Sequence, residues 1–149
     1  MTHEDYMNQA LTLAREAAAH GEVPVGCVIV RDGNIIGRGR NRREEKQAVS
    51  SHAEMEAMAQ ANEALGSWRL EDCDLYVTLE PCPMCAGAIL NARVRRVFYG
   101  ARDRAMGACG GVLNLFMEDF PQHPALVGGV LAEECRAVLT DFFRQLRRI

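Results

Sequence analysis

The chain has 149 residues, of which 48% are hydrophobic and 25% charged, and its formal net charge is −3. This length predicts a single domain, residues 1–149, that can bury a core. The composition is typical of a globular protein, and no apolar run approaches the roughly 20 residues of a membrane span. Because the first residues also lack the pattern of a secretory leader, we expect a cytoplasmic protein with no membrane partner.

The first half of the chain alternates helix and strand patterns. Apolar residues at helical spacing predict a helix over residues 2–20, started by the pair Thr2 and Asp5 and followed by Gly21. The apolar residues 25–30 and the segment 34–39 flank the turn pair Asp32-Gly33, which predicts a β-hairpin. Polar residues 40–50 predict a loop, and Ser51 with Glu54 fits a capping box for a helix over 52–65.

The second half continues the alternation. The sequence predicts a strand over 75–79, a helix to about residue 92, a strand over 94–99, a loop over 100–111, a short helix over 112–117 and a strand over 125–130. The last helix, 131–148, has a broad apolar face on which we expect Phe142 to enter the core. This order predicts an α/β domain with one mixed sheet covered on both faces.

Two short motifs thirty residues apart predict a metal site. Cys82 and Cys85 lie between a strand-like and a helix-like segment, so the first helical turn presents both thiols on one side. The positive end of the helix favours their thiolate forms. His52 can supply a third ligand, and three protein ligands with one open position are typical of catalytic zinc. Glu54 follows His52 by two residues and can carry protons beside the metal.

Each motif alone has other interpretations. A lone C-x-x-C also describes a thioredoxin-like redox pair, and a lone histidine is more often a surface residue. Together, however, His52-Ala53-Glu54 and Pro81-Cys82-x-x-Cys85 match the H-x-E…P-C-x-x-C pattern of zinc nucleobase deaminases. We therefore favour a catalytic zinc site. The other four cysteines occur singly in mostly apolar stretches, which predicts buried free thiols: Cys27, Cys73, Cys109 and Cys135.

Most of the 17 basic residues fall in three windows, 38–46, 93–104 and 136–148, and almost all are arginine. Arginine suits phosphate contacts and stacking on bases. If the windows converge on the pocket, they form a basic rim on an acidic protein. The alternative, that each is a solvated face, is open on charge alone.

Over nearly its whole length the chain resembles the bacterial tRNA adenosine deaminases (TadA-type) of the cytidine-deaminase-like superfamily. Beyond the metal motifs, the resemblance rests on these segments: Glu22-Val23-Pro24-Val25-Gly26, Gly39-Arg40-Asn41-Arg42, Leu79-Glu80, Ala86-Gly87-Ala88, Gly100-Ala101-Arg102-Asp103, Gly107-Ala108, Glu134-Cys135 and Asp141-Phe142-Phe143-Arg144. The metal motifs define the superfamily, and these segments narrow it to the tRNA branch.

The resemblance implies a three-layer α/β/α fold with a mixed five-stranded sheet, one Zn²⁺ per subunit and a homodimer. It also implies hydrolytic conversion of the wobble adenosine of a tRNA anticodon stem-loop to inosine, with release of ammonia. His52, Cys82 and Cys85 would hold the zinc, and Glu54 would move protons between water, ring and leaving amine.

The resemblance further implies a set of substrate contacts. Those near the base or its backbone are Asn41, Val23, Pro24, Ala53 and Asp103, and those on the last helix are Phe143 and Arg144. Four of them have a plainer interpretation: Asn41 as a turn residue, Val23 and Pro24 as packing residues, and Asp103 as an exposed ion pair.

Two segments differ from the family pattern on the RNA-facing side: Ala105-Met106 and Gln122-His123-Pro124. Two other functions are therefore considered. One is a deaminase of a free base or nucleoside, such as guanine or cytosine, with the same zinc chemistry. The other is a non-enzymatic RNA-binding or redox module stabilised by a structural zinc, which requires a fourth protein ligand.

Overall fold

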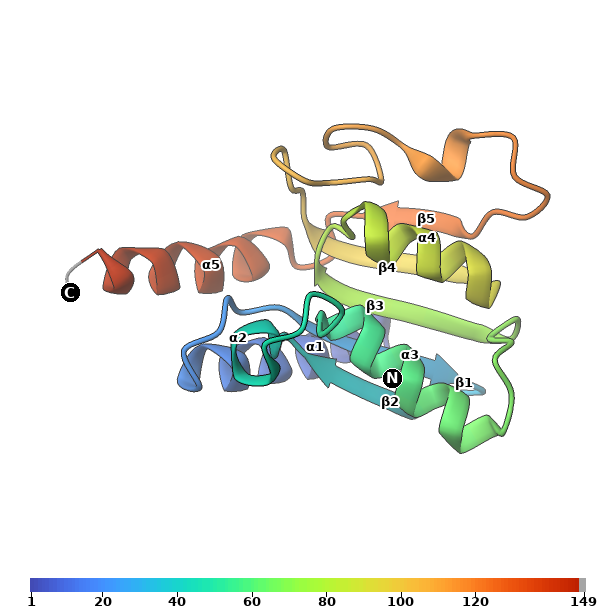
Figure 1. The fold of residues 1–149 in the computed structure, drawn as a ribbon, viewed down its shortest axis with the longest axis horizontal. Helices are drawn as coiled ribbons and strands as arrows, with labels where there is room; N and C mark the ends of the chain where they lie inside the picture. The colour runs from blue at the N-terminus through green and yellow to red at the C-terminus, as the bar shows by residue number, and fades with distance from the viewer. Residues whose placement is uncertain (148–149) are drawn as a thin grey trace.

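The structure is a computed structural model that describes residues 1–147. One sheet of five strands, in the order β2-β1-β3-β4-β5, carries the fold (Figure 1). The strands are β1 (Gly26–Arg31), β2 (Asn34–Arg40), β3 (Cys73–Leu79), β4 (Arg96–Ala101) and β5 (Ala125–Gly128). β1 runs antiparallel to β2 and β3, whereas β3, β4 and β5 are parallel. The expected mixed five-stranded sheet is confirmed.

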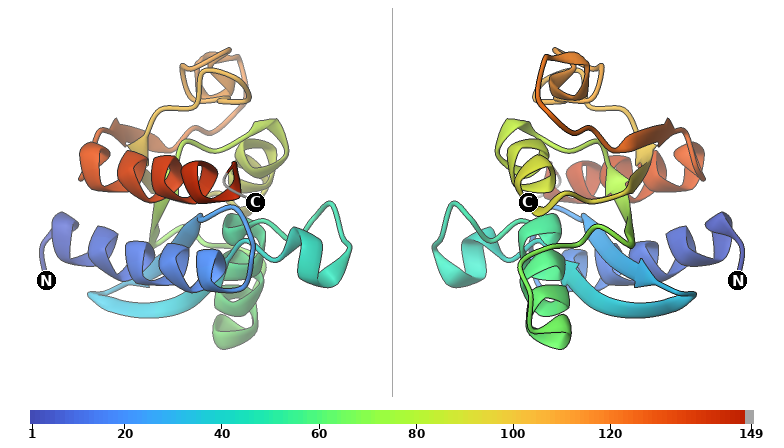
Figure 2. Two further views of the ribbon diagram at one scale, coloured as in Figure 1. Left: turned by 90° about the vertical axis from the view of Figure 1, so that its left-hand side faces the viewer. Right: turned by 90° about the vertical axis from the view of Figure 1, so that its right-hand side faces the viewer.

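Helices cover both faces of this sheet (Figures 1 and 2). On one face, α1 (His3–Ala19) and α5 (Ala132–Leu146) pack against strand residues such as Val28 and Tyr76. On the other, α3 (Ala53–Leu65) and α4 (Pro83–Ala92) pack against Leu75, Val77 and Val97. Because successive strand side chains point to opposite faces, the sheet separates two cores. The three-layer α/β/α arrangement is therefore as expected.

Local signals of the first half act as predicted. Thr2 and Asp5 form a reciprocal capping box at the start of α1. Gly21 follows the end of this helix with φ 79°, a left-handed conformation that glycine adopts without steric cost. Asp32 and Gly33 both have positive φ, 50° and 78°, and join β1 to β2.

Three local predictions are wrong. Residues 40–50 are not all loop, because they contain the short helix α2 (Arg43–Lys46). Ser51 does not cap α3: the N-cap is His52, which places Glu54 one position too early for a capping box. The helix expected over 112–117 is only the 3₁₀ turn η1 (Leu115–Met117).

The last helix differs most from expectation. α5 projects beyond the sheet on the side where α2 lies (Figure 1), and Cys135 is its one fully buried side chain. Phe142 is only partly buried and belongs to neither core among the described residues, so its assignment to the core is wrong. The physical reason is that α5 projects beyond the sheet, so that Phe142 lies outside both cores. Arg148, the expected end of this helix, lies outside the described residues.

Two further expectations concern composition. Cys27, Cys73, Cys109 and Cys135 are all buried, as predicted. Within residues 1–147, no helix combines the length and the apolar character that a membrane crossing requires.

Candidate active site

The starts of two helices on the same face of the sheet meet at the site. His52 is the N-cap of α3 and Cys82 the N-cap of α4, and neither side chain makes a capping hydrogen bond. Instead they face each other: Nδ1 of His52 lies 3.7 Å from Sγ of Cys82 and 3.5 Å from Sγ of Cys85. The three ligand atoms all lie within 4.8 Å of one another. One imidazole and two thiols at this separation fit a zinc ion.

The surroundings already favour a thiolate. Hydrogen bonds from Cys85 and His52 lower the pKa of Cys82 to about 4, and its place at the start of α4 acts in the same direction. Its hydrogen bond to Cys82, together with burial, raises the pKa of Cys85 well above its usual range. The hydrogen bond to Cys82 also raises the pKa of His52. These side chains therefore share protons that a bound metal would displace.

Glu54 lies beside this group on the first turn of α3. Its side chain is only 4% exposed, and burial raises its pKa to about 7. A carboxyl group with a pKa near neutrality can both accept and release a proton. The arrangement places such a group next to His52, Cys82 and Cys85, which we call the metal-ligand triad, as the H-x-E spacing predicts.

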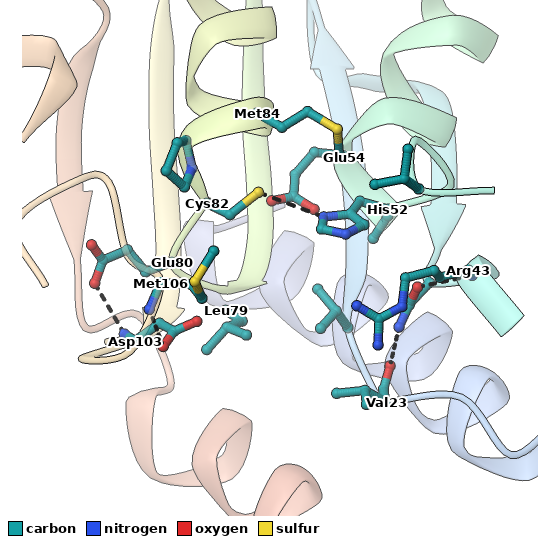
Figure 3. Close-up of a pocket in the computed structure, with 15 residues that line it drawn as sticks. Val23, Arg43, His52, Glu54, Leu79, Glu80, Cys82, Met84, Asp103 and Met106 are labelled. Carbon is teal, nitrogen blue, oxygen red and sulfur yellow. Dashed lines mark hydrogen bonds between the residues drawn. The ribbon is translucent and has the colours of Figure 1, made fainter. Parts of the chain in front are cut away.

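His52, Glu54 and Cys82 form the floor of a pocket of about 450 Å³, within the usual range for small-molecule sites; Cys85 is buried and does not line it. Val23 and Arg43 lie on one side of it, Asp103 and Met106 on the other, and His52, Glu54 and Cys82 between them (Figure 3). The lining consists of Val23, Val25, Asn41, Arg43, Val49, His52, Ala53, Glu54, Leu79, Glu80, Cys82, Pro83, Met84, Asp103 and Met106.

Comparison with known proteins agrees with this geometry. The family model of the MafB19-like deaminases matches residues 1–147. The tRNA-specific adenosine deaminase of Bacillus subtilis is 49% identical over 150 residues, which cover 99% of this chain and 93% of that protein. The chain belongs to the tRNA-specific adenosine deaminase family. It is accordingly a deaminase, an enzyme that acts on a C–N bond.

Two solved structures extend the comparison. One, from a study of A-to-I editing by tRNA:A34 deaminases at the wobble position of transfer RNA, superposes with a TM-score of 0.87. It is 44% identical, and the match covers 91% of this chain and 99% of that chain. A guanine deaminase from Bacillus subtilis is 45% identical over 68% of this chain and 66% of that chain, with a TM-score of 0.66. The fold of the tRNA deaminase thus matches over more of both chains.

Most of the expected substrate contacts of this deaminase lie at the pocket. Val23, Asn41, Ala53 and Asp103 line it. Pro24 is buried and does not line it. Phe143 and Arg144 lie on the projecting part of α5, exposed and away from the lining.

Two of these residues bond to the backbone beside the pocket. The contacts of Asn41 also fit its plainer interpretation as a turn residue, whereas Asp103 forms no ion pair among the described residues. The amide nitrogen of Asn41 donates to the carbonyl of Val23, and its amide oxygen accepts from the backbone N–H of Arg43. Asp103 accepts from the backbone N–H groups of Ala105 and Met106. Through these bonds Asn41 shapes the side wall of the pocket that holds Val23 and Arg43, and Asp103 shapes the side wall that holds Met106.

The sequence did not indicate several lining residues of this deaminase. Arg43 belongs to the unexpected helix α2, and Met106 lies in a segment that differs from the family pattern. Val49 is 78% exposed at the edge of the pocket. Glu80, next to the metal motif, is 2% exposed and also lines the pocket. Glu80 could have been noticed as a charged residue after a buried strand.

The three arginine windows do not converge on the pocket. Arg95 and Arg96 both pair with Asp74 at the start of β3. In the first window, the basic residues near Arg43 are held by carboxylates: Arg40 by Glu45, Arg42 by Glu45 and Glu56, and Lys46 by Glu56. Among residues 1–147, Arg43 is the arginine that lines the pocket, and no described carboxylate pairs with it.

Proposed function

We propose that this protein hydrolyses the 6-amino group of the wobble adenosine in a tRNA anticodon stem-loop, giving inosine and ammonia, with one zinc ion per subunit. The observation that carries the proposal is the floor of the pocket. A His/Cys/Cys group and a buried carboxyl, Glu54, lie together there in a chain 49% identical to a tRNA-specific adenosine deaminase.

The residues at the floor of the pocket have two chemical roles, metal binding and proton transfer. His52, Cys82 and Cys85 would hold the zinc, which in such sites activates water near neutral pH. Glu54 accepts the proton that the water loses and delivers it to ring N1 of adenine. It then takes the proton of the new C6 hydroxyl and gives it to the departing amine, so that the C6–N bond breaks as the C6 carbonyl forms. Water and adenosine are consumed, and inosine and ammonia are formed. The pKa of Glu54, about 7, suits a group that must do both.

The walls of the pocket suit a base removed from its stack. Val23 and Ala53 offer apolar contact, and Pro24, the residue after Val23, is buried. Enzymes that act on a base bind it in such a pocket and read its polar edge by hydrogen bonds. Asn41 and Asp103 lie on opposite walls, where they can contact the nucleoside and its backbone.

The anticodon loop would extend from the pocket toward α5. Phe143 is 39% exposed on this helix, and Arg144 follows it. An exposed aromatic ring beside a guanidinium suits stacking on unpaired bases. Arg144 pairs with Asp141 on its own helix only at 3.6 Å, with both side chains exposed, so RNA can compete for it.

A homodimer is part of the proposal. An apolar groove away from the pocket is lined by Trp68, Leu90, Leu115, Phe120 and neighbouring residues, with Arg93 at its side. Trp68 is 51% and Phe120 is 44% exposed. Aromatic residues and arginine are enriched in protein interfaces. Sedimentation of the wild type and of Phe120→Asp tests whether this groove joins two copies.

The decisive test is an assay of zinc-loaded protein on three substrates: an anticodon hairpin with a wobble adenosine, free adenosine and free guanine. We expect inosine in the hairpin, read as G after reverse transcription, and little ammonia from the free compounds. A hairpin with adenosine moved one position from the wobble site is the matched control. Turnover of guanine with an unchanged hairpin would instead assign the protein to the free-base deaminases.

A further inference from the structure

Two buried carboxyl groups flank the pocket and do not contact the metal-ligand triad. Glu22 precedes Val23 and is 1% exposed, and Glu80 precedes Pro81 and is 2% exposed. Buried carboxyl groups are ordinarily paired with cations. No described arginine or lysine lies within 4.0 Å of either one. Their oxygens accept hydrogen bonds from backbone N–H groups instead, so each carboxyl holds the chain segments that surround it in place.

Glu80 holds the loop that forms one wall. Its Oε1 accepts from the N–H of Asp103 at 3.0 Å, and its Oε2 accepts from Cys109 at 2.9 Å and Gly111 at 2.8 Å. Residues 103–111 are thereby attached to the segment that carries Cys82. This loop brings Asp103 and Met106 to the pocket.

The loop is also shaped to admit this carboxyl group. A Cβ atom at Gly107 would overlap the carboxyl of Glu80 and the backbone carbonyl of Asp103. One at Gly111 would overlap the same carbonyl and lie 2.8 Å from Oε1 of Glu80. A side chain at either position would therefore force apart the Glu80 carboxyl and the start of the loop at Asp103. Next to these contacts, the N–H of Ala108 donates to the carbonyl of Pro81 at 2.8 Å. Glycine at 107 and 111 is what allows the loop to close on Glu80.

Glu22 holds the opposite wall in the same way. Its Oε1 accepts from the N–H of Glu44 at 3.1 Å, and its Oε2 accepts from the N–H of Glu45 at 2.6 Å. Both donors belong to α2, the helix that brings Arg43 to the pocket. Through Glu22, this helix is attached to the chain just before Val23.

We propose that Glu22 and Glu80 are positioning residues that set the two side walls of the pocket, and so determine how tightly the nucleotides around the target base are bound. This inference rests on the proposed function for its substrate but not for its geometry. Neither carboxyl takes part in proton transfer. Each acts through a wall, Glu22 through Arg43 and Glu80 through Asp103 and Met106.

The test uses Glu80→Gln and Glu22→Gln in the full zinc-loaded chain, with each variant as the control for the other. Glutamine has the size of glutamate but only one acceptor oxygen, so at least one amide in each cluster loses its partner. In Glu80→Gln we expect amide hydrogen exchange to rise about tenfold, the loss of one such bond, at Asp103, Cys109 or Gly111 and not at Glu44 or Glu45. In Glu22→Gln we expect the reverse.

Kinetics on the anticodon hairpin supply the second measurement. We expect KM to rise about tenfold in each variant, again the factor for one hydrogen bond, while kcat and zinc content stay close to wild type. Gly107→Ala, which reaches the same carboxyl from the loop, should reproduce the effect of Glu80→Gln.

Different results overturn the inference. A general rise in exchange over the whole chain, or a lower kcat at unchanged KM, would mean that the carboxyls only stabilise the fold. Unchanged exchange in either cluster would mean that they do not hold the walls. If the wild type fails to act on the hairpin, the proposed function fails, but the exchange pattern still decides the role of the two carboxyls.

Discussion

The two ends of β3 use the same kinds of residue for different purposes. At its start, Asp74 is 5% exposed and accepts hydrogen bonds from the guanidinium groups of Arg95 and Arg96. Beyond its end, Glu80 accepts only backbone amides among the described residues, and Cys82 opens the metal-ligand group. Carboxyls at the first end are neutralised by arginine, whereas those at the second shape a pocket. Whether a buried carboxyl belongs to the pocket therefore depends on the end of β3 at which it lies, and not on the sign of its charge.

The largest effect should come from the metal ligands at the site end. In Cys82→Ala and His52→Ala we expect zinc to be lost and deamination of the hairpin to become undetectable, because three ligands are the minimum for such a site. Zinc content by mass spectrometry and inosine formation measure both. Cys135→Ala, on the other face of the sheet, is the matched control and should keep both. A Cys82→Ala protein that keeps its zinc would show that the ion is held elsewhere.

The next effect separates metal binding from proton transfer. Glu54→Gln should retain zinc and lose about 10²–10⁴-fold in kcat, the usual contribution of a general acid–base group. Glu63→Gln on the exposed side of the same helix is the control and should have wild-type turnover. Single-turnover inosine formation gives the rate. A loss of less than tenfold in Glu54→Gln would contradict the role given to this carboxyl.

A smaller effect is expected from replacing an arginine at the pocket, Arg43, and it is compared with the effect of replacing Arg95 at the start of β3. Arg43→Gln should raise KM for the hairpin several-fold and reduce the salt dependence of binding by about one unit of slope, as expected for one phosphate contact. Arg95→Gln should change neither, because its guanidinium is held by Asp74. Hairpin binding at several salt concentrations measures the slopes. Equal slopes for both variants would mean that pocket position does not distinguish these arginines.

The smallest effect on activity is expected at the opposite end. The guanidinium groups of Arg96 and Arg95 outweigh the burial of Asp74 and lower its pKa. A lowered folded-state pKa contributes stability above the unfolded-state value of about 3.9, and this contribution disappears as pH falls through the folded-state pKa. Asp74→Asn should therefore lower the free energy of unfolding by about 1–2 kcal/mol near pH 7, with unchanged kcat.

Denaturant unfolding at pH 7 and at pH 3 measures this difference. It should shrink at the lower pH, because Asp74 in the unfolded wild type then binds a proton more readily than in the folded state. A difference that is constant between the two pH values would contradict the ion-pair account. A lower kcat per folded molecule would mean that the two ends of β3 are not independent.

The floor of the site could be predicted from the sequence, because its residues fall in two short motifs whose spacing and residue types are chemically specific. The C-x-x-C spacing on a helix start and the H-x-E spacing on another determine which side chains meet. The walls could not be predicted in the same way. Glu22 and Glu80 bind backbone amides of α2 and of residues 103–111, and backbone amides carry no sequence signal.

The fold, like the site, has some features that could be predicted from the sequence and others that could not. The β-hairpin and the capping box of Thr2 and Asp5 follow from local residue signals and were correctly predicted, whereas the five strands of the sheet were implied by the family resemblance. The packing of α5 was not correctly predicted. An apolar helical face indicates that another surface covers the helix, but it does not indicate which surface. Phe142 has the spacing of a core residue and is nevertheless only partly buried. The sequence left open whether the arginine windows converge on the pocket, since it does not show that Asp74 holds Arg95 and Arg96 at the other end of β3.

The measurement that tests the central claim most directly is zinc-edge X-ray absorption on the purified protein. We predict one zinc per chain with two sulfur neighbours, one imidazole nitrogen and one light atom from solvent, the coordination of an open catalytic site. Four protein ligands around the ion, or a protein that folds and deaminates the hairpin without zinc, would contradict the account.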